Sequence, residues 1–229
     1  VVYLDRTPNV SSTMKRSDRF RIIRVGIVGT GRIAPRFVAE ARYVSGQDIL
    51  CAFNPEKESG RKFEKEHGIK VYQESYEEFL EKVDAVYIAS PNETHEDYAR
   101  RALEAGKHVL CEKAFTVNAE QAQKLFDLAK EKKLLITEAI WTRYMPSRKM
   151  INDIIESGVI GEVTAVTANL SYTVSHVERI RKPELAGGAL LDVGVYPINF
   201  ASMVLGDKVK DVKATAIFQN GVDILDSIA

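Results

Sequence analysis

Between residues 21 and 140 the chain alternates regularly between short apolar runs and amphipathic stretches. The apolar runs, such as RIIRVGIVG and DAVYIAS, are rich in Ile and Val and are typical of buried strands. The stretches between them carry apolar residues at helical spacing, as in TGRIAPRFVAEARYV. Such alternation predicts an α/β fold in which helices cover a doubly wound parallel sheet.

Beyond Trp141 the periodicity changes to strict alternation. Every second residue of GEVTAVTANLSY and VKDVKATAIF leans apolar, which predicts strands over 162–172 and 209–218 with one solvated face each. A helix is predicted over 193–205. The second part of the chain is therefore expected to be an α+β domain with an open, largely antiparallel sheet. The predicted segments are 1–20, a linker or extension, then a first domain over 21–140 and a second over 141–229.

The composition argues against several classes of protein. Hydrophobic residues make up 45% of the 229 residues and charged residues 28%, which is ordinary for a globular protein in water. The formal net charge is zero, which disfavours a nucleic-acid-binding protein. The sequence shows no apolar run of membrane-spanning length, no secretory signal and no cluster of metal ligands. Cys51 and Cys111 lack disulfide or zinc spacing and predict buried free thiols in the cytoplasm.

A glycine-rich turn joins the first predicted strand to the first predicted helix. In VGIVGTGRIA, Gly29, Gly31 and Ala34 form the pattern G-x-G-x-x-A. Gly29 permits the tight turn, Gly31 lets a pyrophosphate approach the backbone, and Ala34 allows the helix to pack closely on the strand. An ordinary loop is the alternative, but the strand–turn–helix context favours a Rossmann site for NAD or NADP.

The second strand is expected to end in the residue that selects between NAD and NADP, and the sequence there is FNPEKE. An acid binds the ribose hydroxyls of NAD, whereas an Arg accepts the 2′-phosphate of NADP. Asn54 has no charge to repel a phosphate, and Lys57 or Arg61 would favour one. Glu56 favours NAD, so this motif leaves the choice open.

Two further motifs follow predicted strands. SPNETH is interpreted either as an ordinary helix start, with Ser90 or Thr94 as the cap and His95 in solvent, or as part of a cofactor site. CEKAF holds Glu112 and Lys113, which form either a plain charge pair or part of the site. Ligands of doubly wound sheets gather at the carboxyl ends of the strands, which keeps the site interpretation open for both motifs.

The stretch GGALLDVGVYPINF, residues 187 to 200, places an acid and a phenol four residues apart among apolar residues. In a helix, Asp192 and Tyr196 project from one face. Asp192 is either a helix cap or ion-pair partner, or it belongs to a site. Tyr196 is either a core aromatic with a satisfied hydroxyl or a second site residue. The sequence shows no Ser-His-Asp or Cys-His arrangement that would compete with this pair.

Four stretches, VGIVGTGRIA, YIASPNETH, CEKAF and GGALLDVGVYPI, together resemble the glucose–fructose oxidoreductase/inositol dehydrogenase (Gfo/Idh/MocA) family. The resemblance runs from about Arg24 to Phe218 and is closest to a group with dihydrodiol and NADP-dependent D-xylose dehydrogenases. It implies that Lys113, Asp192 and Tyr196 are catalytic, and it gives NADP a slight preference over NAD. The residues that it implies for cofactor binding are Gly29, Thr30, Gly31, Arg32, Ile33, Asn54, Ser90, Pro91, Asn92, His95, Glu112 and Lys113.

Three features depart from the family pattern. The family's D-x-G-x-H is D-V-G-V-Y here, with Tyr196 in place of the histidine, as in the named group. The family's E-K-P is E-K-A, and a cis peptide bond after Lys113 is costly without proline. Relatives have a larger second domain with more strands, so the chain is expected to be a fragment whose substrate-binding and dimerisation domain is partial and whose sheet edge is open.

The implied function is an NAD(P)-dependent oxidoreductase that transfers a hydride between nicotinamide and a carbinol of a sugar, polyol or dihydrodiol. A free Tyr, with a pKa near ~10, is a poor base, but a cation such as Lys113 favours its phenolate. Asp192 is expected to accept and orient a substrate hydroxyl. The alternative is a catalytically inactive dinucleotide-binding sensor or regulatory protein. The full-length protein is expected to be a homo-oligomer with a small-molecule substrate and without nucleic acid or membrane as partner.

Overall fold

The computed structural model describes residues 21–174 and 176–229; the predicted linker or extension over 1–20 lies outside the described residues. The chain forms two compact units. The N-terminal unit comprises the chain up to Ser90 together with Asp97–Cys111 and Gln123–Thr137. The C-terminal unit comprises Pro91–Glu96, Glu112–Ala122 and Glu138–Ala229.

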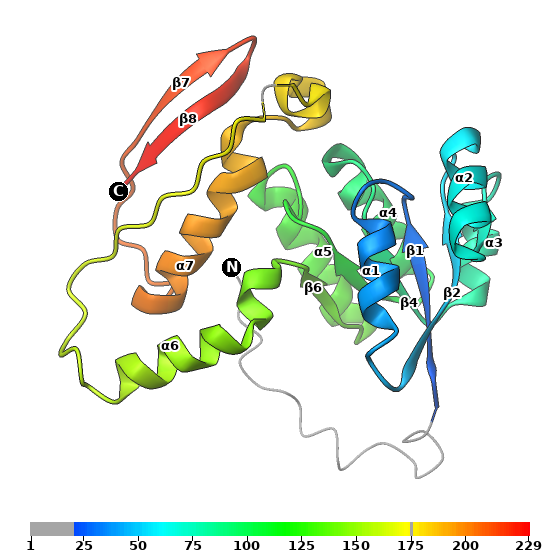
Figure 1. Ribbon diagram of the computed structural model, residues 1–229, viewed down its shortest axis with the longest axis horizontal. Helices are drawn as coiled ribbons and strands as arrows, with labels where there is room; N and C mark the ends of the chain where they lie inside the picture. The colour runs from blue at the N-terminus through cyan, green and yellow to red at the C-terminus, as the bar shows by residue number, and fades with distance from the viewer. Residues whose placement is uncertain (1–20, 175) are drawn as a thin grey trace. The chain divides into compact units, whose positions relative to one another are not determined.

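A six-stranded sheet with the order β3-β2-β1-β4-β5-β6 forms the centre of the N-terminal unit (Figure 1). Strand β1 runs parallel to β2 and β4, β2 to β3, and β4 to β5. This order is that of a doubly wound Rossmann sheet, which confirms the predicted fold class. The strands are β1 Ile23–Val28, β2 Gln47–Phe53, β3 Lys70–Tyr72, β4 Ala85–Ile88, β5 His108–Cys111 and β6 Ile136–Glu138.

Two of the helices that follow these strands, α2 and α3, begin at residues whose side chains cap them. The carboxylate of Glu56 accepts hydrogen bonds from main-chain N–H groups at the start of α2, and Gly68, with a φ of 68°, ends that helix. Strand β3 and helix α3 were not predicted from the sequence, although Ser75 and Glu78 form the S-x-x-E pattern of a capping box. The helices are α1 Ala34–Ala41, α2 Lys57–His67, α3 Tyr76–Lys82, α4 His95–Glu104 and α5 Ala119–Lys132.

The core of the N-terminal unit anchors the end of β1, where the glycine turn begins. Ile27 and Ile88 are completely buried in neighbouring strands. A Cβ atom on Gly26 would lie 2.4 Å from the ring of Phe79, so glycine is what lets α3 pack directly on β1. Cys51 and Cys111 are buried and form no disulfide, as predicted, and burial raises the pKa of Cys51 to about 11.

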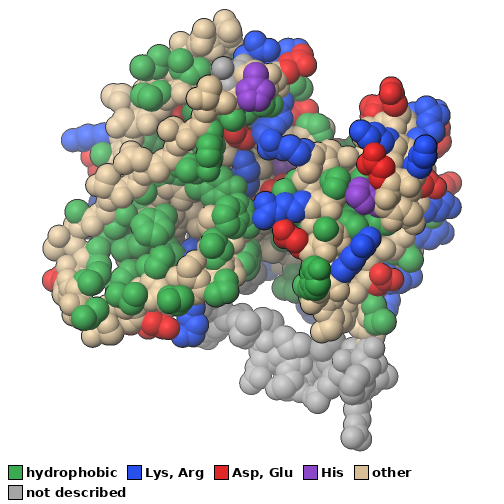
Figure 2. Space-filling model, in the orientation of Figure 1, with side chains coloured by type: hydrophobic (Ala, Val, Ile, Leu, Met, Phe, Trp, Pro, Cys, Tyr) green, Lys and Arg blue, Asp and Glu red, His purple; other side chains and the backbone are tan. Residues whose placement is uncertain are grey.

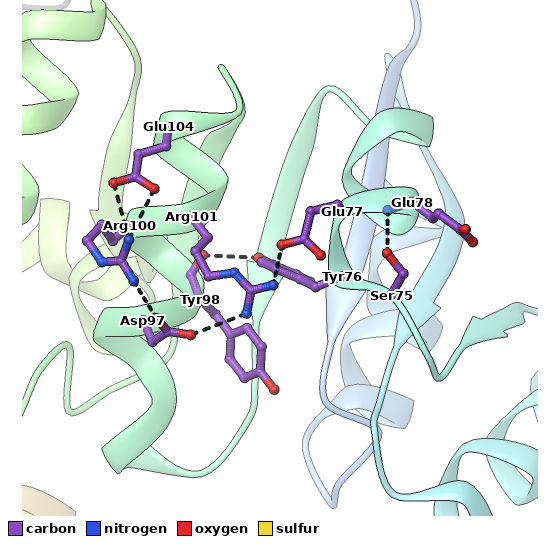
Figure 3. Close-up of polar contacts among 9 residues, drawn as sticks. All are labelled: Ser75, Tyr76, Glu77, Glu78, Asp97, Tyr98, Arg100, Arg101 and Glu104. Carbon is purple, nitrogen blue, oxygen red and sulfur yellow. Dashed lines mark hydrogen bonds and ion pairs between the residues drawn. The ribbon is translucent and has the colours of Figure 1, made fainter.

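A polar network joins α3 to α4 (Figure 3). The hydroxyl of Tyr76 donates a hydrogen bond of 3.0 Å to the main-chain oxygen of Tyr98. The guanidinium of Arg101 lies 4.7 Å from the centre of the Tyr76 ring and forms ion pairs with Glu77 and Asp97. Burial raises the pKa of Tyr76, so its hydroxyl keeps its proton and continues to donate. These contacts hold α4 beside α3.

The C-terminal unit contains the helices α6 Pro146–Glu156 and α7 Val195–Leu205 and the antiparallel strands β7 Ala214–Gln219 and β8 Val222–Ile228. A π-helical turn over Leu190–Gly194 leads directly into α7. The predicted helix over 193–205 and the predicted antiparallel pairing are therefore confirmed. Figure 2 shows hydrophobic side chains gathered over α6 and α7, and Met150, Ile154, Ile198 and Leu205 are among the exposed ones.

Two predicted strands need correction. Residues 162–172 form no strand, and the second predicted strand begins at Ala214 instead of residue 209. Alternation shows which side chains share a face, but a strand also needs a neighbour that satisfies its main-chain N–H and C=O groups. Within the described part of the C-terminal unit, β7 and β8 pair with each other, and 162–172 pairs with neither.

Strand β8 was not predicted from the sequence, although a typical turn sequence precedes it. Asn220 and Gly221 join β7 to β8 with φ values of 53° and 81°. An Asn-Gly pair between apolar runs is the strongest short-range sign of a two-residue hairpin, because such turns require positive φ at both positions. The hairpin therefore follows from the sequence after all.

One helical segment corrects the expectation that no run reaches membrane-spanning length. Pro183–Leu205 spans 23 residues with a mean hydropathy of 1.4. Positive φ values at Ala186 and Gly188 interrupt it, and it carries the ion-paired Asp192. Length and composition alone are therefore weak evidence for a membrane here.

Candidate functional site

The glycine turn has the shape of a phosphate-binding loop. Gly29 has a φ of 92°, and a Cβ atom there would lie 2.8 Å from the main-chain oxygen of Ala89, so the position requires glycine. A Cβ atom on Gly31 would meet no other atom within 4 Å among the described residues. Ala34, the first residue of α1, is completely buried, and Ile33 before it has no polar side chain to cap the helix. Main-chain N–H groups at this helix start therefore suit an anion.

A polar cluster lies behind this turn at the ends of β1 and β2. The hydroxyls of Thr30 and Ser59 are 2.7 Å apart, and the amide nitrogen of Asn54 donates to both. The amide oxygen of Asn54 accepts from the main-chain N–H of Glu56 at 3.1 Å. Thr30 and Asn54 were predicted site residues, whereas Ser59 was missed. The cluster fixes the main chain that follows β1 and β2.

Glu56 and Lys57, which favour different cofactors, both bind other groups of the protein. The carboxylate oxygens of Glu56 accept from the N–H groups of Glu58 and Ser59, which lowers the pKa of Glu56. The ammonium of Lys57 forms a 2.7 Å ion pair with Glu74. Arg32 and Arg61 are both exposed. Neither Glu56 nor Lys57 therefore decides between NAD and NADP.

The SPNETH motif is divided between the units, with Ser90 at the end of the N-terminal unit and Pro91, Asn92 and His95 in the C-terminal unit. His95 is completely buried, and its Nδ1 lies 2.8 Å from the main-chain oxygen of Ala114. The interpretation of His95 as a solvated residue is therefore wrong. The buried imidazole needs a hydrogen-bond partner, and this one ties it to the CEKAF motif. The Lys113–Ala114 peptide bond in that motif is cis, despite the missing proline.

Lys113 and Asp192 meet within the C-terminal unit. The Lys113 ammonium donates to the main-chain oxygen of Asp192 and lies 3.2 Å from its Oδ1. The guanidinium of Arg179 lies 2.9 Å from the same Oδ1. The side chains of Asp192 and Lys113 are 11% and 18% exposed. Burial opposes ionisation of Asp192, but the two cations outweigh it and lower its pKa, so the carboxylate stays charged.

Tyr196 completes this cluster. Its hydroxyl oxygen accepts a 3.1 Å hydrogen bond from the indole nitrogen of Trp141, and the Lys113 ammonium lies 5.5 Å from the centre of its ring. We expected Lys113 to favour the phenolate, but the pKa of Tyr196 is raised, chiefly by burial. The ammonium lies over the ring and donates to Asp192, and the nearby carboxylates of Glu112 and Asp192 also disfavour a phenolate.

The loop around Lys113 is held by two glutamates. Glu112 accepts from the main-chain N–H of Lys113 at 3.3 Å, and Glu138 accepts from that of Phe115 at 3.0 Å. Burial raises the pKa of Glu138. Glu138, Trp141 and Arg179 were not predicted as site residues. The first two lie in EAIWTRYMP and Arg179 lies in VERIRKPE, two stretches that carry none of the motifs described above.

The predicted site residues thus form two groups. Gly29, Thr30, Gly31, Arg32, Ile33, Asn54 and Ser90 lie in the N-terminal unit, at or near the ends of β1, β2 and β4. Pro91, Asn92, His95, Glu112, Lys113, Asp192 and Tyr196 lie in the C-terminal unit. The C-terminal group contains the Lys113 ammonium, which contacts the Asp192 carboxylate and lies over the ring of the neutral Tyr196 phenol. Such groups can bind and exchange protons with an alcohol or a carbonyl.

Family models match most of the chain. Residues 23–139 match the model for the GFO/IDH/MocA oxidoreductase family with an NAD-binding Rossmann fold, and residues 149–229 match the model for the GFO/IDH/MocA C-terminal domain. A D-xylose 1-dehydrogenase (NADP(+)) of Hypocrea jecorina is 47% identical over 133 residues, which cover 54% of this chain and 34% of that protein. A trans-1,2-dihydrobenzene-1,2-diol dehydrogenase of Bos taurus is 33% identical over 208 residues, which cover 88% of this chain and 62% of that protein.

Solved structures give the same picture. An NAD-binding protein from Listeria innocua matches 91% of this chain and 63% of its own chain, with a TM-score of 0.75 and 31% identity. A 3-ketoreductase from Actinomadura kijaniata, in complex with NADP and TDP-benzene, matches 84% of this chain and 59% of its own, with a TM-score of 0.73 and 32% identity. The chain spans less than two thirds of the length of each of these four relatives.

Proposed function

Because the chain belongs to the Gfo/Idh/MocA oxidoreductase family, we propose that the full-length protein transfers a hydride between a nicotinamide and a carbinol carbon of a sugar, polyol or dihydrodiol. The observation that carries this proposal is the cluster of Lys113, Asp192 and Tyr196 within one unit. Three of the relatives named above are a D-xylose dehydrogenase, a dihydrobenzene-diol dehydrogenase and a 3-ketoreductase, which supports the substrate class.

The residues of the cluster would divide the chemistry as follows. Bound NAD(P) would supply or accept the hydride, so the protein must move one proton to or from the substrate oxygen. Tyr196 is neutral at neutral pH, so it can donate that proton when a carbonyl is reduced and must lose its own before it can accept one. The Lys113 ammonium can stabilise negative charge on the substrate oxygen. Asp192, kept ionised by Lys113 and Arg179, can accept a hydrogen bond from a neighbouring substrate hydroxyl.

This assignment predicts opposite pH dependences for the two directions. Oxidation needs the Tyr196 phenolate, whose pKa is raised above the usual value of about 10, so kcat/KM for oxidation should rise with pH throughout the range below it. Reduction needs the protonated phenol and should stay constant over the same range. Initial rates in both directions between about pH 6 and about pH 10 test this. A plateau of the oxidation rate near neutral pH would contradict a Tyr196 base with this pKa.

We further propose that the cofactor is NADP in preference to NAD. Asn54 places no charge at the end of β2, and Glu56 is engaged at the start of α2. Titration of the purified protein with each dinucleotide, followed by thermal shift, should give a smaller dissociation constant for NADP than for NAD, because the better ligand stabilises the native state more. The same preparation should then reduce its cofactor with an aldose, an inositol or a dihydrodiol. A tenfold tighter constant for NAD would overturn the preference.

The proposal from family membership extends to the domain organisation and the assembly of the full-length protein. We propose a dinucleotide-binding domain over 21–140 and a substrate-binding and dimerisation domain from 141 onward, in a cytoplasmic homo-oligomer without nucleic acid or membrane as partner. Exposed apolar side chains on β7 and β8 support an interface through this sheet, among them Ile217, Phe218, Ile224 and Leu225. Light scattering of the full-length protein tests the assembly.

A further inference from the structure

The hairpin β7–β8 touches the start of the helical segment that carries Asp192 and Tyr196. Asp223 of β8 accepts a 2.6 Å hydrogen bond at its Oδ2 from the main-chain N–H of Leu190, the first residue of the π-helical turn. Ala189, at the cap position, makes no side-chain hydrogen bond to the helix. The cap therefore comes from a residue 33 positions further along the chain.

The two glycines before this turn are shaped to receive that carboxylate. Gly188 has a φ of 112°, and a Cβ atom there would lie 2.1 Å from Oδ1 of Asp223. A Cβ atom on Gly187 would lie 2.6 Å from the main-chain oxygens of Arg179 and Ile180. The Gly187–Gly188 turn is thus enclosed by Asp223 on one side and by the Arg179–Ile180 backbone on the other, which is why neither position tolerates a side chain.

A second carboxyl group, that of Asp226, interacts with Asp223. The ladder between β7 and β8 has a bulge, with Ile217 paired to Leu225 but Phe218 paired to Asp223, so Ile224 is the extra residue. One extra residue brings positions 223 and 226 onto the same face of the strand. Burial and the Asp223 carboxyl raise the pKa of Asp226 to about 6, and the two side chains share a hydrogen bond. Below a pH of about 6 the protonated Asp226 can donate to Asp223, which remains the acceptor for Leu190.

We propose that Asp223 is a positioning residue for the reaction: it holds the start of the helical segment so that Asp192 and Tyr196 keep their places beside Lys113. Asp192 lies two residues and Tyr196 six residues beyond Leu190 in one continuous helical stretch. If Leu190 shifts, Asp192 and Tyr196 therefore move together relative to Lys113, which belongs to a separate loop. The inference rests on the proposed function, since it concerns the same three residues.

Two substitutions at Asp223 separate a positioning role from general packing. Asp223→Ala removes the acceptor for Leu190, and kcat of the full-length protein should fall roughly 10- to 100-fold, as for a misplacement of catalytic groups by about 1 Å. Dinucleotide affinity should stay unchanged, because neither Asp223 nor its hydrogen-bond partner Leu190 is among the residues proposed to bind the cofactor. Asp223→Asn keeps an oxygen for Leu190 and gains an N–H for the Asp226 carboxylate, so it should restore kcat to within about threefold of wild type.

Asp211→Ala is the matched control, because Asp211 is an exposed acid of the same unit whose Oδ1 accepts from the N–H of the next residue. Amide hydrogen exchange provides a readout independent of turnover: Asp223→Ala should exchange faster over 189–196, and Asp223→Asn should not. A wild-type protein without turnover would refute the proposed function. The amide exchange of wild type and Asp223→Ala would then still test whether Asp223 holds the start of the helical segment. Equal kcat and equal exchange in wild type and Asp223→Ala would refute the positioning role.

Discussion

Tyr196→Phe is expected to lower kcat of the full-length protein by about 10²- to 10⁴-fold, the usual contribution of a positioned general acid or base. Phe keeps the ring in its edge-to-face contact with Trp141, where the ring centres are 6.3 Å apart. What it loses is the hydroxyl, and with it the 3.1 Å hydrogen bond from the Trp141 indole. Steady-state kinetics should therefore show the loss in kcat, while the melting temperature stays close to that of the wild type.

Lys113→Met is expected to reduce kcat by a similar factor for a different reason. Met replaces the aliphatic stem of Lys113 but removes the ammonium that would stabilise charge on the substrate oxygen. Asp192 keeps its ion pair with Arg179 at 2.9 Å, so the buried carboxylate is not left without a cation and the unit should still fold. Circular dichroism and a thermal melt check the fold before the kinetics are measured.

Two exposed residues serve as matched controls for this pair. Tyr43→Phe alters a phenol that is 91% exposed in the N-terminal unit, and Lys149→Met alters an ammonium on α6 that pairs with Asp153. Both should keep kcat within about twofold, as surface substitutions usually do. If Tyr196→Phe and Lys113→Met turn over as fast as these controls, the proton transfer belongs to other residues and our assignment of roles is wrong.

Gly31→Ala is expected to weaken dinucleotide binding by more than tenfold without unfolding the protein. The added methyl group would meet no described atom within 4 Å, so its effect on the free energy of unfolding should stay within about 0.5 kcal/mol. A bound pyrophosphate must approach the backbone at this position, and the methyl group would stand in its way. Calorimetric titration with NADP, together with a denaturant melt, measures both quantities.

Gly29→Ala is the contrasting variant in the same turn. Its φ of 92° and the 2.8 Å approach to the Ala89 oxygen make any side chain strained there. The variant should lose about 1–3 kcal/mol of stability, in the range of a strained backbone position. The two neighbouring substitutions should thus separate a position needed for binding from one needed for folding. Unchanged NADP affinity in Gly31→Ala would place the phosphates elsewhere.

The N-terminal sheet could be predicted from the sequence except for β3 and the helix α3, whereas the second half was predicted less well. The other strands and helices of the Rossmann sheet each have a local signal: an apolar run, a helical period or a capping residue such as Glu56. The segment 162–172 had an equally regular period and still forms no strand. Its alternation describes side chains, while strand formation depends on the main chain finding a partner.

By itself, the sequence determined the glycine turn and most of the order of strands and helices in the first half, because each depends on residues close together in the chain. The family resemblance of its motifs added Lys113, Asp192 and Tyr196 as candidates. Only the tertiary structure decided what surrounds them. Arg179 pairs with Asp192, Trp141 donates to Tyr196, and Asp223 caps the turn before Asp192. These contacts join residues that lie 13, 55 and 33 positions apart, and such meetings depend on how whole elements pack, which no local period encodes.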